Sequence, residues 1–440
     1  MKKTMKFLQI NTLALLLAVF TAGNVNGQID NLANLSPDYV RTGARNAATD
    51  AADAAVYNPA GLNQLEEGIH LSIGNQSLFR KPSHEYDLGL GEGRKKYTQD
   101  GADWLLPNIY AAWRKKNLAV YGGYYISGGG ATANYTSGSI NTDLIGMMAL
   151  IEAQGAYQST KDNYLEASSA YSTFFAGIAV TPLSKLSVAM SAKLISAKNV
   201  TKAGVTLFSS PLELPDAPLA LNSEETATGM GFVFSANYAL TEGIMIATRY
   251  ETNVDLDFET KTVADDLGLA IDGSKSRRDL PAVFGFGAQV KVSEKITVMA
   301  DYNYYFQKNA DWGTTSATGV ELEWSEMAGD ASLYGISFEY KITDKLSANL
   351  GTVYTAFDYP EKDMYFTKAG AFETVIDDNI SINTGVKYAI NDRFAINAGL
   401  MQNIWEKDVK VKALNAYPLD VDVTTNNSMT TVALGVNMKF

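Results

Sequence analysis

Apolar and polar residues alternate along much of the chain. From Ile296 to Phe306 every second residue is apolar or aromatic, and the residues between them are mostly polar. The same period of two recurs in residues 69–74, 380–388 and 429–440. This period predicts β-strands whose two faces meet different environments. A soluble β-sandwich with an apolar core and a membrane barrel with a polar lumen both fit the alternation.

The spacing of the turns favours the barrel. Short connections lie at Arg114–Asn117, Pro182–Lys185, Leu240–Gly243, Ser293–Lys295, Thr343–Lys345 and Asn391–Arg393. Between them lie long polar connections of roughly 15 to 40 residues, the pattern of outer-membrane barrels, which carry short turns at one end and long loops at the other. Loops of this length are uncommon inside one soluble domain.

We therefore predict an all-β membrane protein, an antiparallel transmembrane β-barrel of about 14 strands. The expected strands start near residues 68, 104, 117, 171, 185, 228, 243, 281, 295, 331, 345, 378, 393 and 428.

The first 27 residues are typical of a secretory signal peptide. Lys2, Lys3 and Lys6 precede an apolar stretch from Phe7 to Phe20, and we expect cleavage after Gly27. No later stretch has the length and apolar character of a membrane-spanning helix. An exported chain of this kind is either soluble or a β-barrel.

The last predicted strand ends in an aromatic residue, Phe440. Such a strand resembles the signal read by the machinery that inserts barrels into the outer membrane, which makes that machinery an expected partner. Pairing of this strand with the first would leave no open sheet edge in lipid. A sandwich strand that ends in Phe by chance is the alternative.

The segment Tyr39–Leu65 differs from the strands because it is rich in Ala, Asn and Asp and contains the turn Asn58-Pro59-Ala60-Gly61. Proline fixes φ in such a turn, and asparagine bonds to nearby backbone. The run ADAAVYNPAGL (Ala52–Leu62) resembles the hatch of the FadL family, outer-membrane channels for long-chain fatty acids and aromatic hydrocarbons.

The resemblance implies a plug in residues 28–67 inside a barrel formed by residues 68–440. It also implies diffusive uptake of a hydrophobic small molecule across the outer membrane of a Gram-negative bacterium. The NPAG turn (Asn58, Pro59, Ala60 and Gly61) would belong to the gate. The alternative is a plug that only fills the lumen.

Two further sites follow from the resemblance. A kink in the third strand opens the barrel wall in that family, so Gly122 and Gly123 are candidates for a lateral exit; they could instead only make room for the plug. In the next loop, residues 141–154 have the spacing of an amphipathic helix. Its apolar face would capture ligand or would fold down over the barrel mouth, and it consists of Leu144, Met147, Met148 and Ile151.

Composition excludes several other classes. A formal charge of −12 disfavours nucleic acid as a partner. The chain has no cysteine and only two histidines, so we expect no metal centre, no cofactor and no enzymatic activity. The 24 tyrosines suit the aromatic girdles of a barrel in contact with outer-membrane lipid.

Lys193 and Arg249 are the candidate cations for a ligand carboxylate, because both fall on the predicted lumen face. Arg249 has an alternative partner in Glu251, two residues further on. Two other functions fit the same barrel, a nonspecific porin and a structural or adhesive surface protein. The sequence does not identify the ligand.

Overall fold

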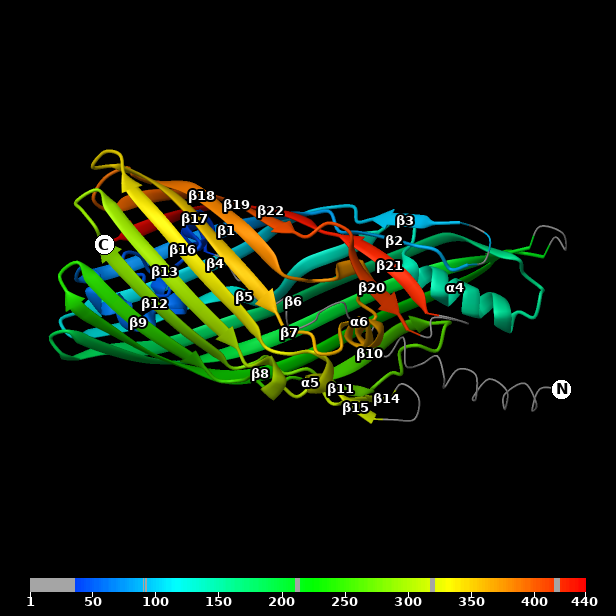
Figure 1. The fold of residues 1–440 in the computed structure, drawn as a ribbon. Coiled ribbons are helices and arrows are strands. Elements are labelled where there is room, and N and C mark those ends of the chain that lie inside the picture. The colour runs from blue at the N-terminus through cyan, green and yellow to red at the C-terminus, as the bar shows by residue number, and fades with distance from the viewer. Residues whose placement is uncertain (1–35, 90, 92, 210–213, 317–320, 415–419) are drawn as a thin grey trace.

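The computed structural model describes residues 36–440 except 90, 92, 210–213, 317–320 and 415–419. The predicted signal peptide, its cleavage site and the first residues of the predicted plug lie outside the described residues. The chain forms a long barrel with an elaborate cap at one end (Figure 1).

A sixteen-stranded antiparallel sheet forms the barrel. Because β8 also pairs with β9, the sheet closes on itself, and β10 and β11 extend beyond the ring, which leaves fourteen strands in it. In chain order the ring strands are β1 (Gly68–Arg80), β4 (Asp103–Lys115), β5 (Leu118–Tyr135), β6 (Ser159–Leu183), β7 (Leu186–Phe208), β8 (Ala217–Thr241), β9 (Ile244–Glu251), β12 (Val283–Lys291), β13 (Ile296–Tyr305), β16 (Ala331–Lys341), β17 (Leu346–Phe357), β18 (Asn379–Ala389), β19 (Phe394–Trp405) and β22 (Ser428–Lys439).

The first and last ring strands pair along their length. The register runs from His70↔Lys439 to Arg80↔Met429, and the Phe440 amide donates to the carbonyl of Ile69 at 2.8 Å. A closed ladder leaves no backbone edge to lipid, as a membrane barrel requires.

The residues on the two faces of the wall decide between the soluble sandwich and the membrane barrel, which the alternation alone could not distinguish. Phe338 and Leu350 are cross-strand partners that point outward, with exposures of 50% and 59%. Ser337 and Asn349 point to the lumen and are buried. An apolar exterior around a polar interior is the pattern of a transmembrane barrel, so the sandwich alternative is wrong.

The predicted strand number is confirmed, and three of the strands are longer than a membrane crossing requires. β6 and β8 each have 25 residues and β7 has 23. A barrel strand needs about 9–11 residues to cross a bilayer. These three strands therefore continue beyond the membrane, where β8 pairs with β10 (Asp257–Asp265) and β10 pairs with β11 (Lys275–Arg277).

The long connections fold into a cap at the end opposite the short turns (Figure 1). The cap contains a four-stranded sheet of β2 (Ser83–Tyr86), β3 (Lys95–Thr98), β20 (Val409–Ala413) and β21 (Val421–Asn426). It also contains α4 (Ile140–Glu152), α5 (Trp324–Met327), α6 (Lys362–Ala369), η3 (Gln307–Asn309), η4 (Phe372–Thr374), β14 (Thr314–Ser316) and β15 (Glu321–Glu323). Among the described residues, the helices are all too short or too polar to cross a membrane.

The plug consists of α2 (Pro37–Thr42), α3 (Ala54–Tyr57) and η2 (Pro59–Gln64). It lies among the barrel strands, toward the end that carries the C-terminus (Figure 1). α2 contacts one side of the wall, chiefly β17, β18, β19 and β22, and η2 contacts the other side, chiefly β6, β7 and β8. Nearly all plug residues are buried.

Candidate functional site

The plug is a compact unit in which the start of α2 is tied to α3. Ser36 caps α2 by accepting the Tyr39 amide at 3.0 Å, and its hydroxyl donates to Asp53 at 2.7 Å. The Ser36 amide donates to the Tyr57 hydroxyl at 3.0 Å. Gly43 ends α2 with a φ of 76°, a left-handed conformation that favours glycine. These bonds join the start of α2 to α3.

Buried ion pairs hold the middle of the plug, and sequence reasoning missed them. Arg41 pairs with Asp38 at 2.9 Å and with Glu339 of the wall at 2.8 Å. Arg45 pairs with Asp53 at 2.5 Å and Asp50 at 2.7 Å. A charge buried in this way requires its partners, because an unpaired ion would carry a large desolvation cost.

The NPAG turn is fixed against β8. The Asn58 side-chain amide donates to the Ala48 carbonyl at 3.0 Å and to Asn237 of β8 at 2.9 Å. The Ala60 amide donates to Ser235 of β8 at 2.9 Å. Pro59 begins η2, and a Cβ on Gly61 would lie 2.5 Å from the Ala48 carbonyl oxygen. The motif therefore has a clear packing role, and its role in a gate stays a prediction.

Glycines on the lumen face of the wall let the plug backbone approach closely. A Cβ would lie 2.5 Å from Arg41 at Gly385 and 2.7 Å from the plug backbone at Gly335 and Gly399. At Gly351 it would overlap the carbonyl oxygen of Thr42. We call this set the glycine belt, and it consists of Gly74, Gly287, Gly335, Gly351, Gly385, Gly399 and Gly435. The belt shapes the lumen to the plug, and the only sequence signal for it is glycine within predicted strands.

Lys193 and Arg249 do face the lumen, and both contact the same carboxylate. Lys193 lies 2.6 Å from Glu251, and Arg249 lies 3.1 Å from it. Arg249 also donates to the carbonyls of Val56 and Tyr57 in the plug at 2.8 and 3.1 Å. The arrangement joins the plug to the wall through Arg249.

The wall has an interruption between β4 and β5. Their ladder runs from Lys115↔Leu118 to Ile109↔Tyr124, and no ladder pair among the described residues joins them beyond that point. β5 continues to Tyr135 along β6, with register shifts on either side of Gly129. The two strands meet again where the Thr132 amide donates to Asp103 at 3.1 Å. We call this interruption, between Tyr124 and Thr132, the wall gap.

Gly122 and Gly123 come just before the wall gap in β5, on the side of the short turns, where β5 pairs with both β4 and β6. Their small size is required there, because a Cβ on Gly122 would lie 2.8 Å from the Phe175 carbonyl oxygen. Their part in a lateral exit stays a prediction. The bulge near Gly129, which has a φ of 64°, interrupts the regular strand a few residues further on.

An aromatic cluster lies on the lumen side of this wall. Tyr125 and Phe175 pack edge to face with ring centroids 5.7 Å apart, and Tyr110 lies beside them. All three belong to one buried cluster with plug residues Ala52 and Leu62. The apolar part of the plug therefore faces the strands that border the wall gap.

The predicted loop helix is confirmed as α4, and its residues differ in accessibility. Ser139 and Thr142 form a capping box at its start. Leu144 and Met147 are buried in a cluster that includes Tyr365 and Phe366 of α6. Met148 is half-buried, and Ile151 is 47% exposed. Only the second half of the predicted apolar face is therefore accessible, and its role in capture stays a prediction.

Two buried titratable groups hold α4 in the cap. His84 accepts the Ile140 amide at 3.1 Å, and burial lowers the pKa of His84 to about 3. Glu373 accepts a bond from the Asn141 side chain at 2.8 Å, and burial raises the pKa of Glu373 to about 7. Both groups are therefore held in their neutral forms more strongly than they would be in water.

The part of the chain that the structure describes contains no cluster of three or more His, Cys, Asp or Glu that could hold a metal ion.

Sequence comparisons gave no relative, since neither a family model nor a curated protein matches the chain.

Solved structures do match, over nearly the whole chain. A FadL homologue from Pseudomonas aeruginosa is 12% identical, with 92% of this chain and 98% of that chain covered and a TM-score of 0.66. The toluene transporter TbuX from Ralstonia pickettii is 18% identical, with 93% and 99% covered and a TM-score of 0.60. The toluene transporter TodX from Pseudomonas putida is 13% identical, with 94% and 100% covered and a TM-score of 0.61. The expected resemblance is thus confirmed at the level of structure, and the chain has the FadL-type fold, a 14-stranded transmembrane β-barrel with an N-terminal plug in its lumen.

Proposed function

We propose that this protein is an outer-membrane channel for the diffusive uptake of hydrophobic small molecules in a Gram-negative bacterium. The observation that carries the proposal is the combination of a plugged lumen with a wall gap beside an apolar cluster. A lumen closed by a plug does not suit a nonspecific porin. We propose the wall gap between β4 and β5 as the route by which an apolar ligand leaves the lumen for the lipid. The structural neighbours are named as a FadL homologue and as toluene transporters, which supports the same class.

In this proposal the ligand first meets the accessible part of α4, where Ile151 and Met148 present apolar side chains. Methionine suits ligands of varied shape because its side chain is flexible and polarisable. The ligand then passes to the aromatic cluster above the plug and leaves through the wall gap. The plug would shift to admit it, and the NPAG turn would take part in that shift.

The charges in the lumen favour an uncharged ligand. The two candidate cations, Lys193 and Arg249, already share Glu251, and Arg249 also binds plug carbonyls. A fatty-acid carboxylate would have to displace these partners. A neutral aromatic or aliphatic hydrocarbon would not, so we propose a hydrocarbon as the ligand class.

Delivery to the outer membrane is part of the proposal. It rests on the signal peptide and on insertion through the terminal strand, which remain predictions. Phe440 is 57% exposed and packs edge to face on Phe394. It is therefore accessible to an insertion partner.

Uptake by cells tests the function. The protein is expressed in a Gram-negative host that lacks its own hydrophobic-compound channels, and uptake of radiolabelled toluene and oleate is measured. We expect toluene uptake to rise well above that of the empty host, with a smaller change for oleate. Equal uptake of both would overturn the ligand class. Uptake of neither, with high ion conductance in planar bilayers, would overturn the channel proposal in favour of a porin. Uptake of neither with no conductance would favour a structural surface protein.

The capture step has its own matched variants. Met148→Asp/Ile151→Asp places charges on the accessible face of α4. The control Val263→Asp/Ile271→Asp changes apolar residues that are 63% and 69% exposed elsewhere in the extracellular part. We expect slower uptake at low toluene concentration for the first pair only. Equal uptake by both pairs would remove α4 from the capture step.

A further inference from the structure

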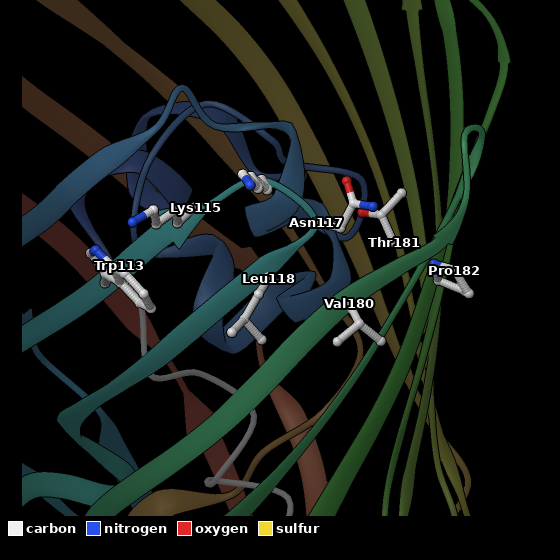
Figure 2. Close-up of a pocket in the computed structure, with 8 residues that line it drawn as sticks. Trp113, Lys115, Asn117, Leu118, Val180, Thr181 and Pro182 are labelled. Atoms are coloured by element: carbon white, nitrogen blue, oxygen red, sulfur yellow. The ribbon is translucent and has the colours of Figure 1, made fainter.

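A concave site lies on the outer wall of the barrel, at the end with the short turns (Figure 2). Its volume is about 670 Å³, and it is shallow and open to its surroundings. It lies between the β4–β5 and β6–β7 turns and is lined by Trp113, Lys115, Lys116, Asn117, Leu118, Val180, Thr181 and Pro182. Short turns mark the periplasmic end of a bacterial barrel. The site therefore lies at the periplasmic rim, where the wall meets the headgroups of the inner leaflet.

The local backbone explains why the wall is hollowed here. The register between β6 and β7 shifts between Val180 and Leu183, so β6 bulges at Thr181 and Pro182. The β4–β5 turn is tight, with Lys116 in the left-handed region at a φ of 52°. The Thr181 amide donates to the Asn117 carbonyl at 2.9 Å, which ties the two turns together. Bulges of this kind occur at barrel rims and redirect the neighbouring side chains.

The floor of the site is apolar and faces lipid. Leu118 and Val180 are ladder partners, and they are 36% and 38% exposed. In Figure 2 they lie side by side between Trp113 on one side and Pro182 on the other. Trp113 is 43% exposed, and tryptophan prefers the membrane interface. An acyl chain is the natural neighbour of this floor.

The edge of the site toward the periplasm is cationic. Lys115 and Lys116 are both exposed, and within the described chain neither ammonium group has a carboxylate partner. The carboxylate of Glu67 does contact this turn, but it does so by accepting the backbone amide of Lys116 at 3.0 Å. Two unpaired lysines side by side are notable in a chain with a formal charge of −12. They supply charge complementary to a phosphate.

The geometry points to a binding site for an anionic phospholipid of the periplasmic leaflet. The headgroup phosphate lies between Lys115 and Lys116, Trp113 lies at the level of the glycerol backbone, and an acyl chain runs over Leu118 and Val180. Basic residues beside a membrane surface attract anionic lipid in this way. The site is on the outer wall, so it does not depend on the transport proposed for the lumen.

Quenching of Trp113 fluorescence by brominated lipid tests the site. The protein is placed in phosphatidylcholine nanodiscs with rising amounts of phosphatidylglycerol or phosphatidylcholine brominated near the headgroup. The chain has five tryptophans, so the signal of Trp113 is the difference between the wild type and Trp113→Phe. We expect half-maximal quenching at a roughly five-fold lower fraction of the anionic lipid than of the neutral one.

Matched variants separate the site from the general surface charge. Lys115→Gln/Lys116→Gln should abolish the preference for the anionic lipid, with quenching by the neutral lipid retained as proof of folding. Lys295→Gln/Lys345→Gln removes two exposed lysines from other periplasmic turns and should leave the preference intact. Equal quenching by the two lipids in the wild type, or equal loss in both variants, would overturn the site. Loss of the preference in excess inorganic phosphate would also overturn it, because it would indicate a free-anion site.

Discussion

The guanidinium group of Arg249 in β9 donates a hydrogen bond of 2.8 Å to the carbonyl oxygen of Val56 in the plug. A second bond, of 3.1 Å, reaches the carbonyl of Tyr57. These carbonyls lie at the C-terminal end of α3, where a cation is favourable. Glu251 holds the guanidinium in place from the wall at 3.1 Å. The plug is thus joined to the wall through the side chain of Arg249.

Replacement of Arg249 should loosen the plug. Arg249→Gln removes the charge from both plug contacts, and hydrogen bonds to charged groups are worth about 1.5–3 kcal/mol each. We expect more frequent openings in single-channel recordings in planar bilayers. Glu251 keeps Lys193 as its partner, so the barrel itself should remain folded. The control is Arg393→Gln on a periplasmic turn, and identical recordings for the two variants would refute the plug contact.

The glycine belt should be sensitive to a single methyl group. At Gly351 a Cβ would overlap the Thr42 carbonyl oxygen, so Gly351→Ala must displace α2 or deform β17. Overpacking of this kind costs about 1–3 kcal/mol. We expect a lower unfolding temperature and a higher basal conductance.

Gly243→Ala is the matched control for the belt. A Cβ there would lie 3.6 Å from its nearest neighbour, an ordinary contact. Unchanged conductance in Gly351→Ala would mean that the plug position does not depend on the belt.

Much of the barrel could be predicted from the sequence. β4, β12 and β16 begin at residues 103, 283 and 331, close to the predicted starts near 104, 281 and 331. These strands alternate between lipid and lumen over the full membrane depth, so the period of two is clear. β6 begins at residue 159 rather than near 171, because its first part pairs outside the membrane, where no apolar face is required.

The functional site was less predictable, because its contacts join residues far apart in the chain. Proximity of Arg45 to Asp53 can be suspected from the sequence, but the contact of Arg41 with Glu339 depends on the barrel register. The same is true of the wall gap. Glycines in β5 indicated an irregular strand, but they could not show that pairing with β4 ends at Tyr124.

The cap should show a pH dependence in which two groups oppose each other. Burial raises the pKa of Glu373 from 4.5 to about 7, so its contribution to stability is present below pH 4.5 and is lost as pH rises toward 7. Burial lowers the pKa of His84 from 6.5 to about 3, so its contribution is present above pH 6.5 and is lost as pH falls toward 3. The two effects partly cancel in the wild type between about pH 4.5 and 6.5.

Glu373→Gln should expose the effect of His84 alone. We expect the free energy of opening of the α4 amides, measured by hydrogen exchange, to fall by on the order of 2 kcal/mol between pH 6.5 and pH 5. The double variant Glu373→Gln/His84→Asn should show no such fall once intrinsic exchange rates are corrected. If the protection of the α4 amides in Glu373→Gln did not change with pH, the pH dependence could not be assigned to His84.

The wall gap can be blocked chemically, because the chain has no cysteine of its own. Ser127 lies in the gap stretch of β5, where its hydroxyl accepts a bond from Thr173 at 2.6 Å. Ser127→Cys should support uptake, and modification of its thiol with a bulky maleimide should then reduce uptake several-fold because the adduct fills the exit. Leu350→Cys on β17, where the side chain is 59% exposed to lipid, accepts the same adduct five strands away from β4 in the ring and should keep full uptake. Modified Ser127→Cys protein with full uptake would show that the ligand leaves by another route. The most direct alternative is a path through the plug into the periplasm, and Arg249→Gln would then raise uptake as well as conductance.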